Sequence, residues 1–204
     1  MAKTKLTLIN NSSDANNSQI VIFQKNVAPE FDDLHTAWRV ISNLGINDTH
    51  PFDYPLDFKI DAADSYWNFT PRILAFYGQS YHMYDAGSGG YVLAPNGAAV
   101  TANQIEIRND LRQGAISANI YKDGKLLATK FPLSPGQKAV FQFKPSIFIG
   151  VTEEQVTEGK AMSPKIISSI NTELSLERIA SADILMTGHG PASFTFELGN
   201  VVKV

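Results

Sequence analysis

Cysteine is absent from the 204-residue chain, so neither disulfide bonds nor thiolate metal sites contribute to its fold or chemistry. No window approaches the roughly 18 consecutive apolar residues that a transmembrane helix needs. The opening residues, MAKTKLTLINNSS, include two lysines but no apolar run of signal-peptide length. From these absences we expect a soluble protein made in the cytoplasm. Release by lysis or by a dedicated secretion system would leave no N-terminal mark.

Charge is also scarce. Seventeen Lys and Arg stand against 20 Asp and Glu, which gives a net charge of -3. The absence of basic clusters argues against nucleic acid or an anionic membrane as the main partner. The histidines, His35, His50, His82 and His189, form no i, i+4 pair and no close motif with acidic residues. The sequence therefore predicts no metal site and no cofactor.

Strand patterns and turn signals are abundant, above all in residues 115–151. Asp123-Gly124 predicts a type I′ hairpin, because Asp and Gly tolerate the positive φ that this turn requires. Pro135-Gly136 predicts a second reversal, in which Pro fixes φ and Gly supplies the left-handed position. We expect four strands in this stretch.

The same patterns predict strands elsewhere, at residues 4–10, 19–25, 56–61, 72–77, 80–84, 104–109, 172–176, 182–186 and 193–198. Residues 29–45 allow two interpretations: an amphipathic helix, or a strand over 35–41, which we favour. Residues 152–164 predict a long loop. The fold class is all-β: a single antiparallel β-sandwich domain over residues 1–204, jelly-roll or immunoglobulin-like, with about ten to twelve strands and at most one short helix.

Three carboxylates lie close to aromatic residues in the first half of the chain. Asp57, Asp61 and Asp64 precede Tyr66 and Trp67, a composition that suits sugar stacking or glycoside hydrolysis. Calcium at Asp61 and Asp64 is an alternative without the spacing of an EF-hand. The plainer interpretation, which we prefer, places Asp57 and Asp61 on the polar face of a strand and Asp64 in a turn.

Besides Phe58, ten aromatic residues fall within forty positions: Phe52, Tyr54, Tyr66, Trp67, Phe69, Phe76, Tyr77, Tyr81, Tyr84 and Tyr91. We expect most of them in the core. Any that are exposed would form an adhesive surface for a sugar or for a second subunit. The residues we name for such a surface are Tyr66, Trp67, Tyr81, Tyr84 and Tyr91, with Asp61 and Asp64 as polar partners.

The glycine-rich stretch at residues 86–90 contains Ser88 between small neighbours. Small-x-Ser-x-Gly is the pattern of a nucleophile elbow, which must leave a strand and enter a helix. Here Tyr91-Val92-Leu93 follows, then Pro95-Asn96-Gly97, which predict a strand and a turn. We therefore interpret the stretch as a hairpin loop.

Several short motifs resemble the small bacterial β-sandwich family that includes the rhizosphere-induced protein. They are Leu8-Ile9-Asn10-Asn11 with the polar loop after it, Val21 to Lys25, Ala37-Trp38, His50-Pro51 and Phe58 to Trp67. The resemblance covers roughly the first 70 residues and departs from the family pattern at Arg39-Val40. It implies a compact all-β bacterial protein with a strand around Trp38, and it carries over no catalytic residue.

Three functions follow from these observations. The first is a non-enzymatic structural protein that self-associates as a homo-oligomer, fibre or inclusion through strand edges and aromatic patches. The second is a carbohydrate-binding module in which Trp67 and nearby tyrosines stack on sugar rings. The third, which we favour least, is a hydrolase acting through Ser88 or the Asp57 to Asp64 group.

Overall fold

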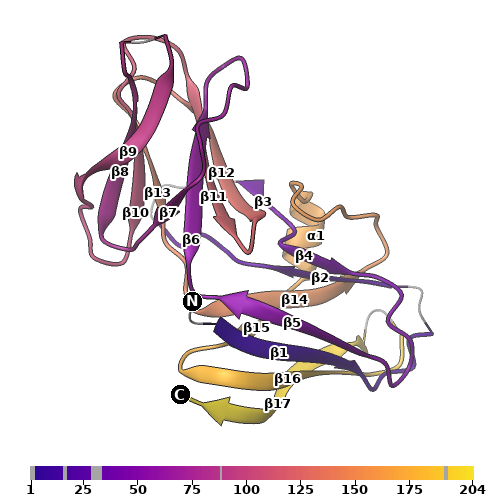
Figure 1. Ribbon diagram of the computed structural model, residues 1–204. Helices are drawn as coiled ribbons and strands as arrows, with labels where there is room; N and C mark the ends of the chain where they lie inside the picture. Colours follow the sequence, from indigo (N-terminus) through magenta and orange to yellow (C-terminus); the bar gives the residue numbers. More distant parts are fainter. Residues whose placement is uncertain (1–2, 16–17, 29–33, 88, 191–192) are drawn as a thin grey trace. The chain divides into compact units, whose positions relative to one another are not determined.

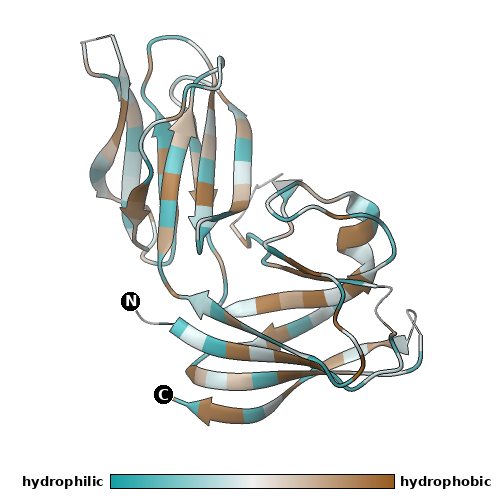
Figure 2. Ribbon diagram, turned by 45° about the vertical axis from the view of Figure 1, so that its right-hand side comes forward, coloured by the Kyte–Doolittle hydropathy of each residue, from teal (hydrophilic) through white to brown (hydrophobic). Residues whose placement is uncertain are grey.

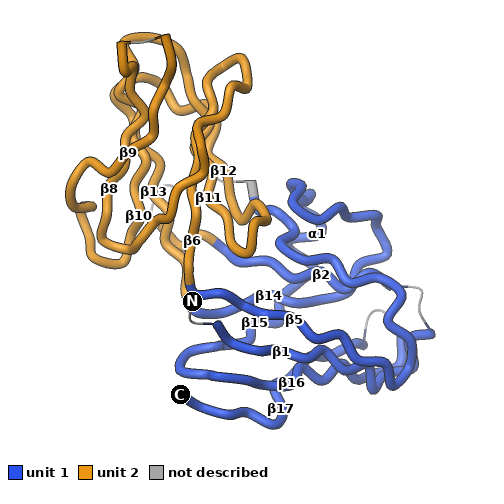
Figure 3. Tube along the Cα trace, viewed as in Figure 1, with its two compact units in different colours: residues 1–25, 35–56, 145–204 blue, residues 26–34, 57–144 orange. Residues whose placement is uncertain are grey.

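The computed structural model describes residues 3–15, 18–28, 34–87, 89–190 and 193–204. Strands dominate these residues and one short helix occurs among them, so the predicted all-β class is confirmed. The strands form four sheets, whose elements are labelled in Figure 1. The chain divides into two compact units, drawn in different colours in Figure 3. Unit 1 comprises residues 1–25, 35–56 and 145–204, and unit 2 comprises residues 26–34 and 57–144.

The first sheet of unit 1 has the strand order β17-β16-β1-β5. Its strands are β17 (Thr195–Lys203), β16 (Ile179–Thr187), β1 (Lys3–Asn10) and β5 (Thr49–Pro55). Strand β1 pairs in parallel with β16 and antiparallel with β5. The predicted alternation along β1 is confirmed, because Leu6 and Leu8 are buried while Lys3 and Lys5 are exposed. This sheet therefore buries one face.

The second sheet of unit 1 has the order β15-β14-β2-β4 and is antiparallel throughout. Its strands are β15 (Thr172–Ser175), β14 (Ser146–Thr152), β2 (Gln19–Phe23) and β4 (Arg39–Ile41). Helix α1 (Pro164–Ser169) begins after Ser163, whose side chain accepts a hydrogen bond from the Ile166 backbone. Ile166 belongs to the same buried cluster as Val21 and Phe23 of β2, so α1 packs on this sheet.

Residues 34–41 contain no helix; they form strand β3 (Leu34–His35), a break and strand β4. The strand that we predicted over residues 35–41 is thus interrupted between His35 and Arg39. Trp38 lies in the break and is completely buried, with its ring 6.4 Å from that of Phe52 and 5.8 Å from that of Tyr54. The backbone bends at Trp38, between the two strands. Residues 29–33 lie outside the described part of the chain.

Unit 2 also contains two sheets. One has the order β13-β10-β8-β9, formed by β13 (Lys138–Phe141), β10 (Ile105–Asn109), β8 (Gln79–Asp85) and β9 (Tyr91–Ala98). The other has the order β3-β12-β11-β6-β7, with β12 (Lys125–Leu133), β11 (Ile116–Lys122), β6 (Phe58–Ala63) and β7 (Ile73–Ala75). Strands β10 and β8 pair in parallel, whereas β11 pairs antiparallel with both β6 and β12.

Both turns predicted in residues 115–151 are present. Asp123 and Gly124 connect β11 to β12 with φ of 53° and 74°, as the type I′ hairpin requires. At the second turn Gly136 has φ of 79°, and the Gln137 amide donates to the Ser134 carbonyl oxygen at 3.0 Å. This turn leads from β12 into β13, a strand of the other sheet. The expected four strands are β11 to β14.

The finer prediction, one antiparallel sandwich of about ten to twelve strands, is not confirmed, because the strands form four sheets in two units. Two parallel pairs, β1 with β16 and β10 with β8, also depart from it. Apolar and polar residues alternate along many strands in Figure 2, and that alternation is what the sequence revealed. It specifies which face of a strand is buried, but not which strand lies beside it.

Candidate functional site

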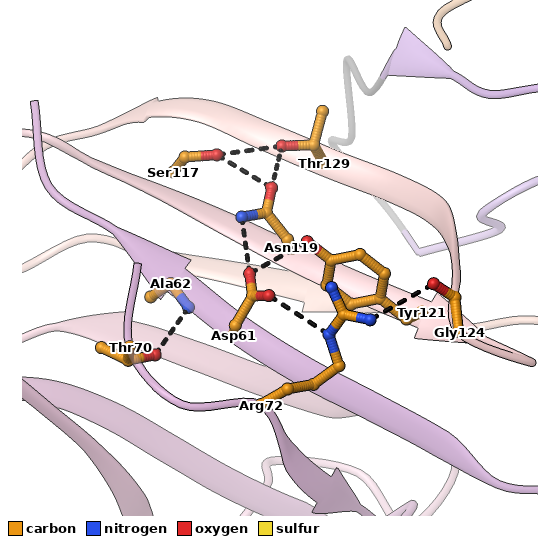
Figure 4. A network of polar contacts seen from close by, with 9 residues as sticks. All are labelled: Asp61, Ala62, Thr70, Arg72, Ser117, Asn119, Tyr121, Gly124 and Thr129. Atoms are coloured by element: carbon orange, nitrogen blue, oxygen red, sulfur yellow. Dashed lines mark hydrogen bonds and ion pairs between the residues drawn. The ribbon is translucent and has the colours of Figure 1, made fainter. Parts of the chain in front are cut away.

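A buried polar network surrounds Asp61 in unit 2 (Figure 4). Two hydrogen bonds stabilise the buried Asp61 carboxylate: Asn119 Nδ2 and Tyr121 Oη donate to its Oδ1 at 2.9 and 3.1 Å. Asn119 lies opposite Asp61 in the β6–β11 register. The hydroxyls of Ser117 and Thr129 both donate to Asn119 Oδ1, at 2.9 and 2.6 Å. These donors fix the amide orientation, so its NH₂ group points at the carboxylate.

Burial of Asp61 corrects the expectation that it lies on a solvated strand face, since the residue is only 3% exposed. The chain that follows β6 turns back and runs antiparallel beside it. The Thr70 amide donates to the Ala62 carbonyl oxygen at 2.8 Å, and Ala62 donates to Thr70 Oγ1 at 3.1 Å. An isolated bridge also joins Ala63 to Phe69. Asp57, by contrast, is half-buried, just before β6 begins.

Arg72 lies on the more exposed side of the network. Its Nε lies 3.4 Å from Asp61 Oδ2, and its Nη1 donates to the Gly124 carbonyl oxygen at 3.2 Å. The guanidinium stacks 3.4 Å from the centre of the Tyr121 ring, a cation–π contact that fixes its plane. Burial and the adjacent negative charge of Asp61 raise the pKa of Tyr121 to about 12, so its hydroxyl remains a donor at neutral pH.

An open hollow of about 440 Å³ lies over this network. Its lining residues are Asp61, Phe69, Thr70, Arg72 and Tyr121. The hollow thus offers a carboxylate, a guanidinium, two hydroxyls and an exposed aromatic ring within one small volume. Such a mixture of apolar surface and a few convergent polar groups is typical of small-molecule sites.

Asp64 organises the loop that carries Trp67. Its Oδ1 accepts from the backbone amides of Tyr66 and Asn68, both at 2.9 Å, and its Oδ2 accepts from Asn68 Nδ2 at 2.9 Å. Burial works to raise the pKa of Asp64, but these hydrogen bonds outweigh it and hold the pKa below its ordinary value. Trp67 follows with φ of 64°, a left-handed conformation that costs a non-glycine residue stability.

Three exposed rings beside the hollow form what we call the aromatic cluster: Trp67, Phe69 and Phe131. They are 59%, 56% and 51% exposed. The Trp67 ring lies 6.5 Å from Phe69 and 5.8 Å from Phe131, at interplanar angles of 34° and 33°. Phe131 comes from β12, where a register shift sets Phe131 and Pro132 against Ser117 alone. Such bulges redirect side chains.

The other aromatic residues that we predicted for a binding surface are dispersed. Tyr66 is 83% exposed and neighbours the cluster along the chain. Tyr81 is 1% exposed and therefore belongs to the core. Tyr84 is half-buried, with its ring stacked 4.6 Å from that of His82, and Tyr91 is 40% exposed at the start of β9. The prediction thus names Tyr66, Trp67 and Tyr91 correctly as exposed residues but misplaces Tyr81.

The expectation that most of the ten aromatic residues are core is wrong. Three are buried: Phe52, Tyr54 and Tyr81. Six are exposed: Tyr66, Trp67, Phe69, Phe76, Tyr77 and Tyr91. Five of these six lie in connections between strands, where a ring has sheet on at most one side. Alternation within strands could not reveal this.

Groups for hydrolysis are not assembled at the hollow. Ser88 lies outside the described residues. Asp64 is occupied by its own loop, and Asp61 is the one carboxylate among the residues that line the hollow. His82 pairs with Asp110, at 2.8 Å between Nδ1 and Oδ2. Within the described ranges no group of three or more His, Cys, Asp or Glu is placed to hold a metal ion.

Sequence reasoning missed Arg72, Asn119, Tyr121 and Phe131. One signal was available for two of them: Asn119 and Tyr121 share a period-2 phase on a strand whose other phase is aliphatic. A polar stripe on a central strand must find partners or solvent. The register against β6, which supplies the partner Asp61, is a long-range property that the pattern does not contain.

Comparison of the chain with protein-family models, with curated proteins and with solved structures finds no match. The resemblance of the first 70 residues to the rhizosphere-induced protein family therefore stays a prediction. In the part of the chain that the structure describes, no helix has the length and apolar character needed to cross a membrane.

Proposed function

We propose that this chain is a non-enzymatic binding protein and that unit 2 binds carbohydrate at the hollow and the aromatic cluster. One observation carries the proposal: the buried, hydrogen-bonded Asp61 carboxylate lies at a hollow whose rim bears the exposed ring of Phe69, with Trp67 and Phe131 beside it. Sugars combine an apolar C–H face with a rim of hydroxyl groups, and this site offers a surface for each.

The apolar half of the argument rests on the exposed rings. Leaving three large rings in water forgoes the stabilisation that burial would give them. A ligand that covers the rings recovers it, and aromatic faces accept the C–H face of a pyranose as they accept other flat apolar groups. Trp67 also keeps an unfavourable left-handed backbone conformation in order to lie there. Strain of this kind is concentrated at functional sites.

The polar half rests on pre-organisation. Asp61 is held by Asn119 and Tyr121, and Arg72 is held by Gly124 and the Tyr121 ring. A ligand meets groups that are already ordered, so binding loses little side-chain entropy. Glycoside hydrolysis usually needs two carboxyl groups on opposite sides of the bond. Among the described residues that line the hollow, Asp61 supplies the one carboxyl group, which supports binding over catalysis.

The test is a glycan array probed with the wild type, Trp67→Ala and the control Phe76→Ala. Phe76 is 53% exposed in the same unit but belongs to neither the hollow nor the cluster, so it matches Trp67 in exposure. We expect Phe76→Ala to bind like the wild type and Trp67→Ala to lose binding. An array with no bound glycan, or Trp67→Ala binding at wild-type strength, would refute the proposal.

Self-association is a second proposal, favoured by the same cluster of three exposed rings. Contiguous apolar patches on a soluble protein commonly mark protein contacts. Pairing is less favoured at three of the edge strands: β5 contains Pro51 and Pro55, β9 contains Pro95, and β17 is irregular at Asn200, where φ is 47°. Prolines and bulges blunt edges. Light scattering during size-exclusion chromatography should then give the mass of an oligomer for the wild type and of a monomer for Trp67→Ala. A wild type that is monomeric at high concentration would refute self-association.

A further inference from the structure

We infer that the hollow selects neutral sugars and holds them through two adjacent hydroxyl groups, one on Asp61 and one on Arg72. The inference rests on the proposed carbohydrate binding and names the ligand chemistry of that site. It follows from which hydrogen-bonding groups at the hollow are already occupied, and from the balance of charge among its lining residues.

The vacant acceptor is Oδ2 of Asp61. Both short hydrogen bonds from Asn119 and Tyr121 go to Oδ1, at 2.9 and 3.1 Å. Among the described residues, Oδ2 has the long contact to Arg72 Nε at 3.4 Å and no other. A carboxylate offers about four lone-pair sites, so Oδ2 has capacity for a hydroxyl donor. A hydroxyl that donates there would make a charge-assisted hydrogen bond, which is stronger than one between neutral groups.

The vacant donors belong to Arg72. A guanidinium has five N–H groups; within the described residues one Nε–H is directed at Asp61 and one Nη1–H at the Gly124 carbonyl oxygen. Stacking on Tyr121 at 3.4 Å fixes the plane in which the remaining donors lie. The guanidinium and the vacant acceptor are therefore neighbours, since Arg72 Nε lies 3.4 Å from Asp61 Oδ2. Two hydroxyls on neighbouring carbons match this pair, because one can donate while the other accepts.

The charge balance decides against acidic sugars. The negative charge of Asp61 and the positive charge of Arg72 cancel, and the other described residues that line the hollow, Phe69, Thr70 and Tyr121, carry no charge at neutral pH. A uronate carboxylate would gain no net attraction, and it would bring a second negative charge close to a buried one, which is costly. A neutral sugar meets no such cost.

The experiment follows the fluorescence of Trp67 during titration with matched oligosaccharides. The chain has two tryptophans; Trp38 is completely buried in unit 1, so a change in quenching by acrylamide reports on Trp67. The probes are galactose oligomers against galacturonate oligomers, and mannose oligomers against mannuronate oligomers. We expect at least one neutral member to bind about tenfold or more tightly than its acidic counterpart, the effect of one hydrogen bond to a charged group.

Two variants test the assigned groups. Arg72→Lys keeps the charge but loses the planar fork, and we expect it to weaken neutral binding about tenfold. Asp61→Asn leaves Arg72 unbalanced, and we expect it to reverse the preference toward the uronate. If Asp61→Asn does not fold, Arg72→Gln takes its place; it should lose neutral binding without gaining uronate binding.

The outcomes separate the two levels of the argument. If neither neutral nor acidic oligomers change the Trp67 signal and calorimetry finds no heat, the proposed carbohydrate binding fails. If uronates bind the wild type as tightly as neutral sugars, or if Arg72→Lys retains neutral binding, the proposed function stands and this inference is overturned.

Discussion

Trp67 offers a measurement of how much stability the site gives up for its geometry. Its φ of 64° places a bulky residue in the left-handed region, where an L-residue loses about 1–2 kcal/mol through contact between Cβ and its own backbone. We therefore expect Trp67→Gly to be more stable than Trp67→Ala, although glycine normally lowers stability. The neighbouring Tyr66, exposed and without a positive φ, provides the matched position.

The magnitudes follow from exposure. Trp67 is 59% exposed, so removing its ring uncovers on the order of 100 Å² of the roughly 250 Å² of a tryptophan side chain, a loss of about 2.5 kcal/mol. Trp67→Ala and Trp67→Gly share this loss. Glycine adds about 0.4–1 kcal/mol of unfolded-state entropy but relieves the strain of about 1–2 kcal/mol. At Tyr66 only the entropic cost remains, so glycine should be the less stable variant there.

The assay is urea unfolding followed by far-ultraviolet circular dichroism, for alanine and glycine variants at both positions. The quantity of interest is the Gly-minus-Ala difference at position 67 less the same difference at position 66, which cancels the entropic term. We expect about 1–2 kcal/mol in favour of glycine at position 67. A value of zero would show that Trp67 is unstrained and would remove the argument that stability is exchanged for function at this loop.

Three further predictions concern buried or constrained groups. Burial lowers the pKa of Lys122 to about 7, so its charge destabilises the native state fully below pH 7 and no longer above about pH 10.5. The free energy of unfolding of Lys122→Met in urea should exceed that of the wild type by on the order of a few kcal/mol at pH 6 and by little at pH 10. Equal gains at both pH values would contradict this. The raised pKa of Tyr121 makes native stability fall as pH rises from 10 to about 12; Tyr121→Phe should flatten that slope, and an unchanged slope would count against the assignment. A Cβ on Gly188 would lie 2.3 Å from the Ser193 carbonyl oxygen, whereas Gly190, also at positive φ, faces open space. Gly190→Ala should lower the free energy of unfolding by about 1–2 kcal/mol, and Gly188→Ala should lower both this free energy and the melting temperature by clearly more. Similar losses for the two variants would refute the clash.

Local features were predictable from the sequence because they depend on neighbouring residues. The Asp123-Gly124 turn has the positive φ values that its composition predicts, and Leu6 and Leu8 of β1 are buried as their alternation indicates. Pairing was not predictable. The parallel neighbours β1 and β16 are separated by most of the chain, and no periodicity within either strand identifies the other.

The candidate site was predictable in part. Asp61 and Trp67 were named from their proximity in sequence, and both belong to the site. The environment of Asp61 was misjudged, because the partners that bury it come from β11 and from Arg72, beyond the reach of a strand pattern. Phe131 required a bulge in β12 to reach Trp67, and an irregularity of one residue leaves no clear trace in composition.

Unit 1 is discontinuous, and this has a consequence during synthesis. Residues 57–144 supply both sheets of unit 2 apart from the two-residue β3, so that unit can close while the ribosome is still making the remainder. Strand β1 must wait for β16, at residues 179–187, before its second edge is covered. Throughout that interval β1 of the nascent protein has one unpaired edge and one apolar face. Segments of this kind are those that chaperones bind.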